Sequence, residues 1–117
     1  MRGNEATFRL GHILTAIERI GCYTECMSSI EFRQNSKVAD ASLLNLSIIG
    51  RAASYTPARF RSQHVEIPWS DIDRLYNLVE PPHPNIDLDR AWQMIRDDLP
   101  AIEKAIRNAL DSDADGS

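Results

Sequence analysis

The chain has 117 residues, of which 43% are hydrophobic and 26% charged, and its formal net charge is −4. This length allows one domain and is too short for two. The mild negative charge argues against a generally basic surface for nucleic acids, although it leaves room for a local basic cleft. No apolar run is long enough to span a bilayer and no signal-peptide pattern is present. We therefore expect a cytoplasmic protein without membrane attachment.

The first half of the chain predicts two long helices. Between about residues 5 and 27, apolar side chains recur at three- and four-residue steps, which places them on one helix face. A second helix is expected from about residue 36 to 55, and it is apolar over so much of its circumference that it should lie centrally. Gly50 and the neighbouring alanines would let another helix approach it closely. Pro57 should end it.

Shorter elements are expected next. Residues 57 to 64 predict a short helix with proline at its first position. The segment from 65 to 68 is extended, and Ser70 is then the expected N-cap of a further helix. Its apolar face includes Tyr76, which we expect to bury its ring and hydrogen-bond its hydroxyl. The prolines at 81, 82 and 84 should terminate this helix.

The last helix should begin at Asp87 or Leu88 and carry one long apolar stripe to Leu110. Pro100 lies inside this stripe and predicts a kink near residues 97 and 98 rather than two separate elements. The sum is an all-α, up-and-down helical bundle with short accessory helices. We expect residues 1–110 to form one domain and residues 111–117 to be a disordered acidic tail.

Other chemistry-bearing residues favour structural roles. Cys22 and Cys26 would share a helix face, but a metal site needs more ligands than two thiols, so we expect free thiols at a core edge and no metal or cofactor. Trp69 and Trp92 are expected to pack in the core rather than stack on bases. His12 should lie at the core edge, and His64 at the end of the short helix.

Several short motifs occur together in a familiar order. They are Arg9-x-x-His12-Ile-Leu, Ala16-Ile17-Glu18-Arg19-Ile20, Leu44-x-x-x-Ile48-Ile49-Gly50-x-Ala52-Ala53, Ile67-Pro68-Trp69-x-x-Ile72, Asp87-Leu88-x-x-Ala-Trp92 and Asp97-Asp98-Leu99-Pro100. Over almost the whole chain, this pattern resembles the HepT-like branch of the HEPN-domain proteins. The resemblance implies a dimerising helical bundle. It also implies the RNA endonuclease toxin of a type VII toxin–antitoxin pair, whose antitoxin is a nucleotidyltransferase of the MNT type.

The resemblance also implies a catalytic motif. Family members use arginine, four to six further residues, histidine, one residue and tyrosine, and they cleave RNA without metal. The antitoxin can adenylylate the tyrosine. Counted from Trp69, the family's arginine falls at Tyr76, the next position matches at Asn77, the histidine falls at Pro81, and the tyrosine falls at His83. The family's glutamate after the Ile-Gly pair is Arg51 here.

These departures lead to three hypotheses. The first is a homodimer with a degenerate ribonuclease site, which binds a nucleotidyltransferase partner or RNA. The second is an active ribonuclease with a rearranged site, in which Arg51, Arg74 and His83 converge near the dimer axis. A histidine there could titrate near neutral pH and an arginine could hold a phosphate. The third is a purely structural dimer domain. Whether the chain is an enzyme is left open by the sequence.

Overall fold

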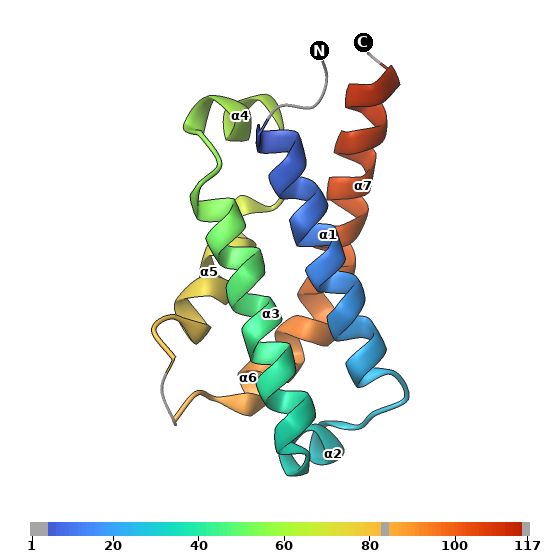
Figure 1. Ribbon diagram of the computed structural model, residues 1–117, viewed down its shortest axis with the longest axis vertical. Coiled ribbons are helices and arrows are strands. Elements are labelled where there is room, and N and C mark those ends of the chain that lie inside the picture. The colour runs from blue at the N-terminus through green and yellow to red at the C-terminus, as the bar shows by residue number, and fades with distance from the viewer. Residues whose placement is uncertain (1–4, 83–84, 116–117) are drawn as a thin grey trace.

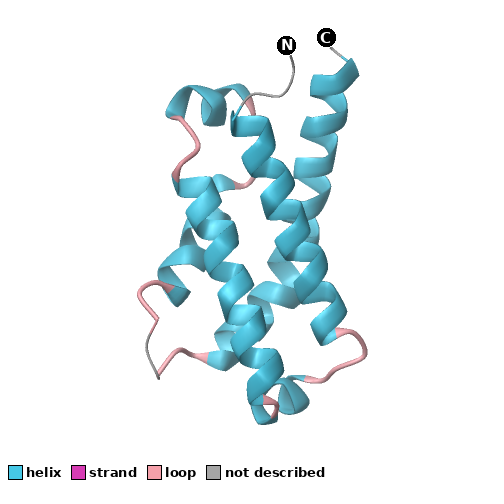
Figure 2. Ribbon diagram, viewed as in Figure 1, coloured by secondary structure: helices cyan, strands magenta, loops and turns pink. Residues whose placement is uncertain are grey.

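The computed structural model describes residues 5–82 and 85–115, with side chains as far as residue 112. Within these residues all regular secondary structure is helical, which confirms the all-α prediction (Figure 1; Figure 2). In chain order the elements are α1 (Glu5–Thr24), α2 (Ser29–Gln34), α3 (Ser36–Ser54), α4 (Ala58–Gln63), α5 (Trp69–Val79), α6 (Leu88–Gln93), the π-helical turn η1 (Met94–Asp98) and α7 (Leu99–Asp115). No helix of the described residues is long and apolar enough to cross a membrane.

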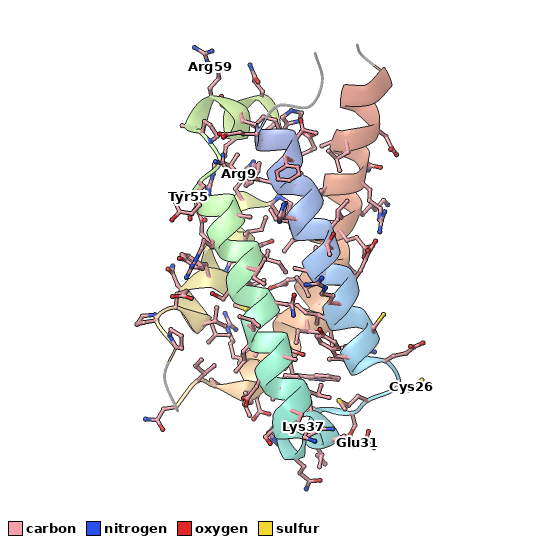
Figure 3. The ribbon with its side chains drawn as sticks, in the orientation of Figure 1. Arg9, Cys26, Glu31, Lys37, Tyr55 and Arg59 are labelled. Atoms are coloured by element: carbon pink, nitrogen blue, oxygen red, sulfur yellow. The ribbon has the colours of Figure 1, made fainter. Side chains whose placement is uncertain are left out.

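Helix α3 occupies the central place predicted for it. It packs most extensively on α1 and next on α5, while α7 lies against α1. Arg9 ties the start of α1 to the end of α3, because its Nη1 donates to the carbonyl of Tyr55 at 2.8 Å (Figure 3). The core between these helices is apolar, and its most deeply buried side chains are Leu10, Ile13, Ile20, Phe32, Leu46, Ile49, Ile67, Ile72, Leu75, Ile102 and Ile106.

Local signals set several helix ends. α1 stops at Thr24 rather than continuing to Met27, because Cys26 has φ 60° and Met27 N–H bonds the Thr24 carbonyl at 3.1 Å. Ser28 then starts α2 through a capping box with Glu31. Two further helices begin at a side-chain N-cap. The Asn35 side chain accepts a backbone N–H at the start of α3, and the Asp87 side chain does the same at the start of α6.

The predicted N-cap of α5 is wrong. Pro68 is the N-cap and Ser70 already lies within the helix, because the N–H groups of Asp71 and Ile72 both reach the Pro68 carbonyl. Trp69 starts the helix and donates its Nε1–H to the His64 carbonyl at 3.0 Å. Similarly, α4 begins at Ala58, one residue after the predicted first helical proline.

The helical path from Leu88 to Asp115 adapts to Pro100. Leu99 N–H bonds the Met94 carbonyl five residues earlier, which makes the turn before the proline wider than an α-helical one. The sequence predicts a kink at residues 97 and 98, and the structure places η1 there, with α6 and α7 meeting at an angle (Figure 1). α7 continues into the acidic tail at 111–117; the disorder of that tail stays a prediction.

Candidate functional site

The site is built where α5 crosses α3. Gly50 lies on the buried side of α3, and a Cβ added to it would lie 2.3 Å from the Cβ of Tyr76. No real Cβ approaches another atom so closely, so the glycine is what permits this contact. The predicted close approach of a helix at Gly50 is confirmed, and it fixes the half-buried ring of Tyr76 against α3.

Four side chains from the two helices form one network, which we call the α3–α5 polar cluster: Ser47, Arg51, Tyr76 and Glu80. The Arg51 guanidinium lies beside the Tyr76 side chain, and its Nη2 lies 3.4 Å from Glu80 Oε2. The interaction with the Tyr76 side chain and then the charge of Glu80 raise the pKa of Arg51 above its ordinary value. Ser47 Oγ–H donates to the same Glu80 oxygen.

A cleft of about 670 Å³ opens beside this cluster. It lies between the outward face of α3 and the segment that follows α5, and its lining residues are Asp40, Leu43, Leu44, Ser47, Ile48, Arg51, Val79, Glu80, Pro82 and Ile86. Most of these side chains are aliphatic. The charged ones among them are one arginine and two carboxylates, so the cleft carries no excess of positive charge.

This arrangement is poorly suited to cleave RNA. Attack by a 2′-hydroxyl requires a general base, a general acid and positive charge at the phosphate. Glu80 offsets the charge of Arg51, and Asp40 adds a second negative charge to the same cleft. Pro81 is exposed and has no titratable group. The described part of the cleft therefore lacks the charge balance that a phosphodiester needs.

The structure separates two of the three residues of the rearranged site. Arg51 lines the cleft, whereas Arg74 pairs with Asp71 one turn earlier on α5. Arg74 lines a different depression of about 200 Å³, together with Arg90, Asp97 and Asp98. Within one chain these arginines do not share a site. His83 lies outside the described residues, and its convergence with the arginines at a dimer axis stays a prediction.

The structure also shows where the predicted tryptophans and histidines lie. Trp92 packs on Phe32 with ring centroids 5.2 Å apart, and Trp69 is buried beneath Arg61, so both tryptophans serve packing as predicted. His64 lies half-buried beside Phe60. The prediction for His12 is wrong in its burial: the side chain is exposed, with its ring on the edge of Phe8. Asn77 is also exposed.

Cys22 and Cys26 are free and exposed, but Cys26 lies beyond the end of α1 and shares no helix face with Cys22. Among the residues whose placement is described, no three His, Cys, Asp or Glu side chains are grouped so that they could hold a metal ion.

Sequence reasoning missed Glu80 as the partner of Arg51 and Ser47 as a donor to Glu80. Ser47 and Arg51 are four residues apart on α3, as are Tyr76 and Glu80 on α5, so each pair shares a helix face. Those two spacings were the available signal. The spacings do not show that α3 and α5 cross at Gly50. It is this crossing that brings the two pairs together.

Comparison with known proteins agrees with this fold. The family profile described as ribonuclease HepT-like matches residues 13–109. The chain belongs to the ribonuclease HepT-like family. It is 28% identical over 102 residues to a Methanocaldococcus jannaschii protein named "Gamma-glutamylcyclotransferase and putative RNase"; the match covers 87% of this chain but only 46% of that relative.

A second relative is the "Probable ribonuclease HepT" of Thermococcus cleftensis, at 29% identity over 94 residues, which are 80% of this chain and 86% of the relative. No solved structure matches the chain. The comparisons therefore support a HepT-like ribonuclease domain built as a helical bundle.

Proposed function

We propose that this HepT-like chain is a cytoplasmic homodimer, by descent the toxin of an MNT/HEPN toxin–antitoxin pair, that has lost the ribonuclease reaction and works by binding a protein. Its partner would be a nucleotidyltransferase of the MNT type. The observation that carries the proposal is the α3–α5 polar cluster. At the family's arginine position stands Tyr76, and the nearby cation, Arg51, is occupied by Tyr76 and Glu80.

The loss is chemical rather than architectural. In the family pattern an arginine on α5 and a histidine after it act on the phosphodiester. Here Tyr76 supplies a neutral hydroxyl at the first position, and Pro81 supplies neither acid nor base at the second. Glu80 next to them would repel a phosphate group. The remaining histidine, His83, stands at the family's tyrosine position, so the acceptor for adenylylation is also replaced.

Charge favours a protein partner over RNA. Binding of RNA depends on neutralising phosphates with lysine and arginine. The cleft has two carboxylates for one arginine, and the whole chain carries a formal net charge of −4. Its lining is otherwise aliphatic, which suits the apolar core of a protein–protein contact. These features support a protein-binding role.

The experiment has an enzymatic arm and a binding arm. Purified protein is incubated with RNA in chelator, beside His83→Ala and Arg74→Ala variants and beside a family member with an intact motif. We expect no cleavage above the buffer control. Cleavage that disappears in either variant would overturn the proposal and support the rearranged site of Arg51, Arg74 and His83.

In the binding arm, the chain is co-expressed with a nucleotidyltransferase encoded beside its gene, and the complex is measured by calorimetry. We expect a stoichiometric complex that survives purification. Failure of the two proteins to bind at micromolar concentration would contradict the partner and leave the structural dimer as the better explanation.

A further inference from the structure

Helix α4 is the element of the bundle that contributes least to its core, since none of its six residues is buried. It lies at the end of the bundle where α1 starts and α3 ends (Figure 1). Two side chains close to its ends in the sequence, Tyr55 and Val65, are 64% and 78% exposed. Exposed apolar residues that stand alone are common on protein surfaces. Two of them beside a helix without buried residues form a surface that the fold of one chain does not require.

Arg61 holds α4 on the bundle, together with the partly buried Phe60. Arg61 Nη2 donates to the Ala53 carbonyl at 2.7 Å, and Nη1 lies 3.2 Å from the carboxylate of Asp73. The guanidinium carbon also lies 4.9 Å from the centroid of the Trp69 ring. Because these contacts join α4 to both α3 and α5, the helix is fixed in place although it buries little. Its outward residues are available to another molecule.

Tyr55 is held in place as well, although its side chain is exposed. Arg9 Nη1 donates to the Tyr55 carbonyl at 2.8 Å, and the Arg9 guanidinium carbon lies 6.0 Å from the centroid of the Tyr55 ring (Figure 3). An aromatic side chain that is already oriented loses little conformational entropy when a partner covers it. Tyrosine and arginine are also among the residue types that carry most of the binding energy at protein interfaces.

The segment around α4 is locally positive in a chain whose formal net charge is −4. Residues 52–65 contain two arginines and one histidine but no aspartate or glutamate. Glu66 follows, and its carboxylate lies 3.4 Å from Nδ1 of His64. Arg59 is exposed and points away from α4, and it forms no ion pair with another residue of the described part of the chain (Figure 3). Arg59 is therefore the uncompensated charge of this segment.

We propose that Tyr55, Arg59 and Val65, which we call the α4 surface, dock an acidic face of a protein partner. Arg59 pairs with a carboxylate of the partner, while apolar groups of the partner cover Tyr55 and Val65. The proposal rests on the proposed function, whose nucleotidyltransferase is the partner meant here, and gives that partner a contact outside the cleft, since none of the three residues lines it. An uncompensated cation selects an acidic partner, because opposite charges steer association and like charges oppose it.

A charge reversal tests the surface in the complex with the nucleotidyltransferase encoded beside the gene, measured by calorimetry. We expect Arg59→Glu to raise the dissociation constant about 10- to 100-fold. Arg19→Glu is the matched control, because Arg19 is also exposed and lies on α1 about four turns from its start, away from α4. It should bind within about threefold of the unmodified protein. Equal weakening by the two variants would show a response to overall charge and would overturn the proposal.

A second substitution tests the aromatic part of the surface. Tyr55→Ala removes an exposed ring and keeps the backbone carbonyl that Arg9 bonds, so the fold should be retained, which circular dichroism checks. We expect the dissociation constant to rise about 10-fold or more. Tyr23→Ala, near the other end of α1, is the matched control and should bind within about threefold of the unmodified protein.

The outcomes separate this inference from the proposed function. A complex whose affinity is unchanged by Arg59→Glu and Tyr55→Ala would overturn the α4 surface and leave the protein partner standing. The absence of any complex at micromolar concentration would overturn both. If Arg59→Glu abolished binding of single-stranded RNA and left the protein complex unchanged, the surface would belong to RNA and the proposal would be overturned.

Discussion

The two halves of α5 differ in what they contribute. In the first half, from Trp69 to Leu75, Ile72 and Leu75 are fully buried and hold the helix on the core. In the second half and the turn after it, Asn77 and Pro81 are exposed and Glu80 is half-buried. Val79 is the buried exception in this second half. The first half therefore serves mainly the core, whereas the second half also places polar side chains beside the cleft.

Tyr76 stands at the boundary between these halves. Its hydroxyl belongs to the polar cluster, but its ring fills the space that Gly50 leaves open. Tyr76 therefore combines a polar role with a packing role, whereas Asn77 and Pro81 are exposed. The comparison of the two halves can be sharpened by substitutions that probe each side and the boundary.

The largest effect is expected in the first half. Ile72→Ala removes a fully buried side chain and leaves a cavity, which should lower the free energy of unfolding by about 2–5 kcal/mol. Asn77→Ala is the control on the same helix, and since Asn77 is exposed it should change stability by no more than about 0.5 kcal/mol. Urea denaturation measures both. Equal losses from the two variants would contradict the division of α5.

A middle effect is expected at the boundary. Gly50→Ala forces its Cβ against Tyr76, so we expect a loss of about 1–3 kcal/mol through overpacking. Tyr76→Ala should relieve this clash, so that the two substitutions together cost less than the sum of their separate effects. A double-mutant cycle by thermal denaturation gives the coupling. Strict additivity would show that Gly50 and Tyr76 do not meet as described.

The smallest effect is expected in the second half. Glu80→Gln keeps an acceptor for Ser47 but removes the charge facing Arg51, and an ion pair with an exposed partner contributes little to stability because solvent screens it. Glu103→Gln is the matched control on α7, where Glu103 pairs with Arg107 at 2.9 Å. We expect similar small changes in urea midpoints. A much larger loss for Glu80 would make it a structural residue of the fold.

Helix periodicity and the positions of the prolines predicted most of the fold. Apolar spacing located α1, α3 and the long C-terminal helical run, and Pro100 indicated the irregular turn before it. The N-cap of α5 was missed because Ser70 has the preferred side chain, whereas the Pro68 carbonyl and the indole bond of Trp69 decide where the helix begins. The preference of serine for N-cap positions contains no information about these two interactions.

The candidate site was predictable only in part. Gly50 indicated a close helix contact, which the structure confirms with Tyr76. The assignment of Tyr76 to the family's arginine position, counted from Trp69, stays a prediction. The pairing of Arg51 with Tyr76 and Glu80 depends on how α3 and α5 cross, which no local spacing specifies. For the same reason the sequence could group Arg51 with Arg74, although within one chain they line different depressions.

The most direct test of the proposed loss of ribonuclease activity places the family's catalytic motif on this scaffold. Tyr76→Arg, Pro81→His and His83→Tyr are combined in one chain, and its rate of RNA cleavage in chelator is compared with that of the unmodified protein. We predict cleavage at least about 100-fold faster in the triple variant, the contribution expected from positioned acid–base groups. An unmodified protein that cleaves RNA as fast as the triple variant would contradict the account.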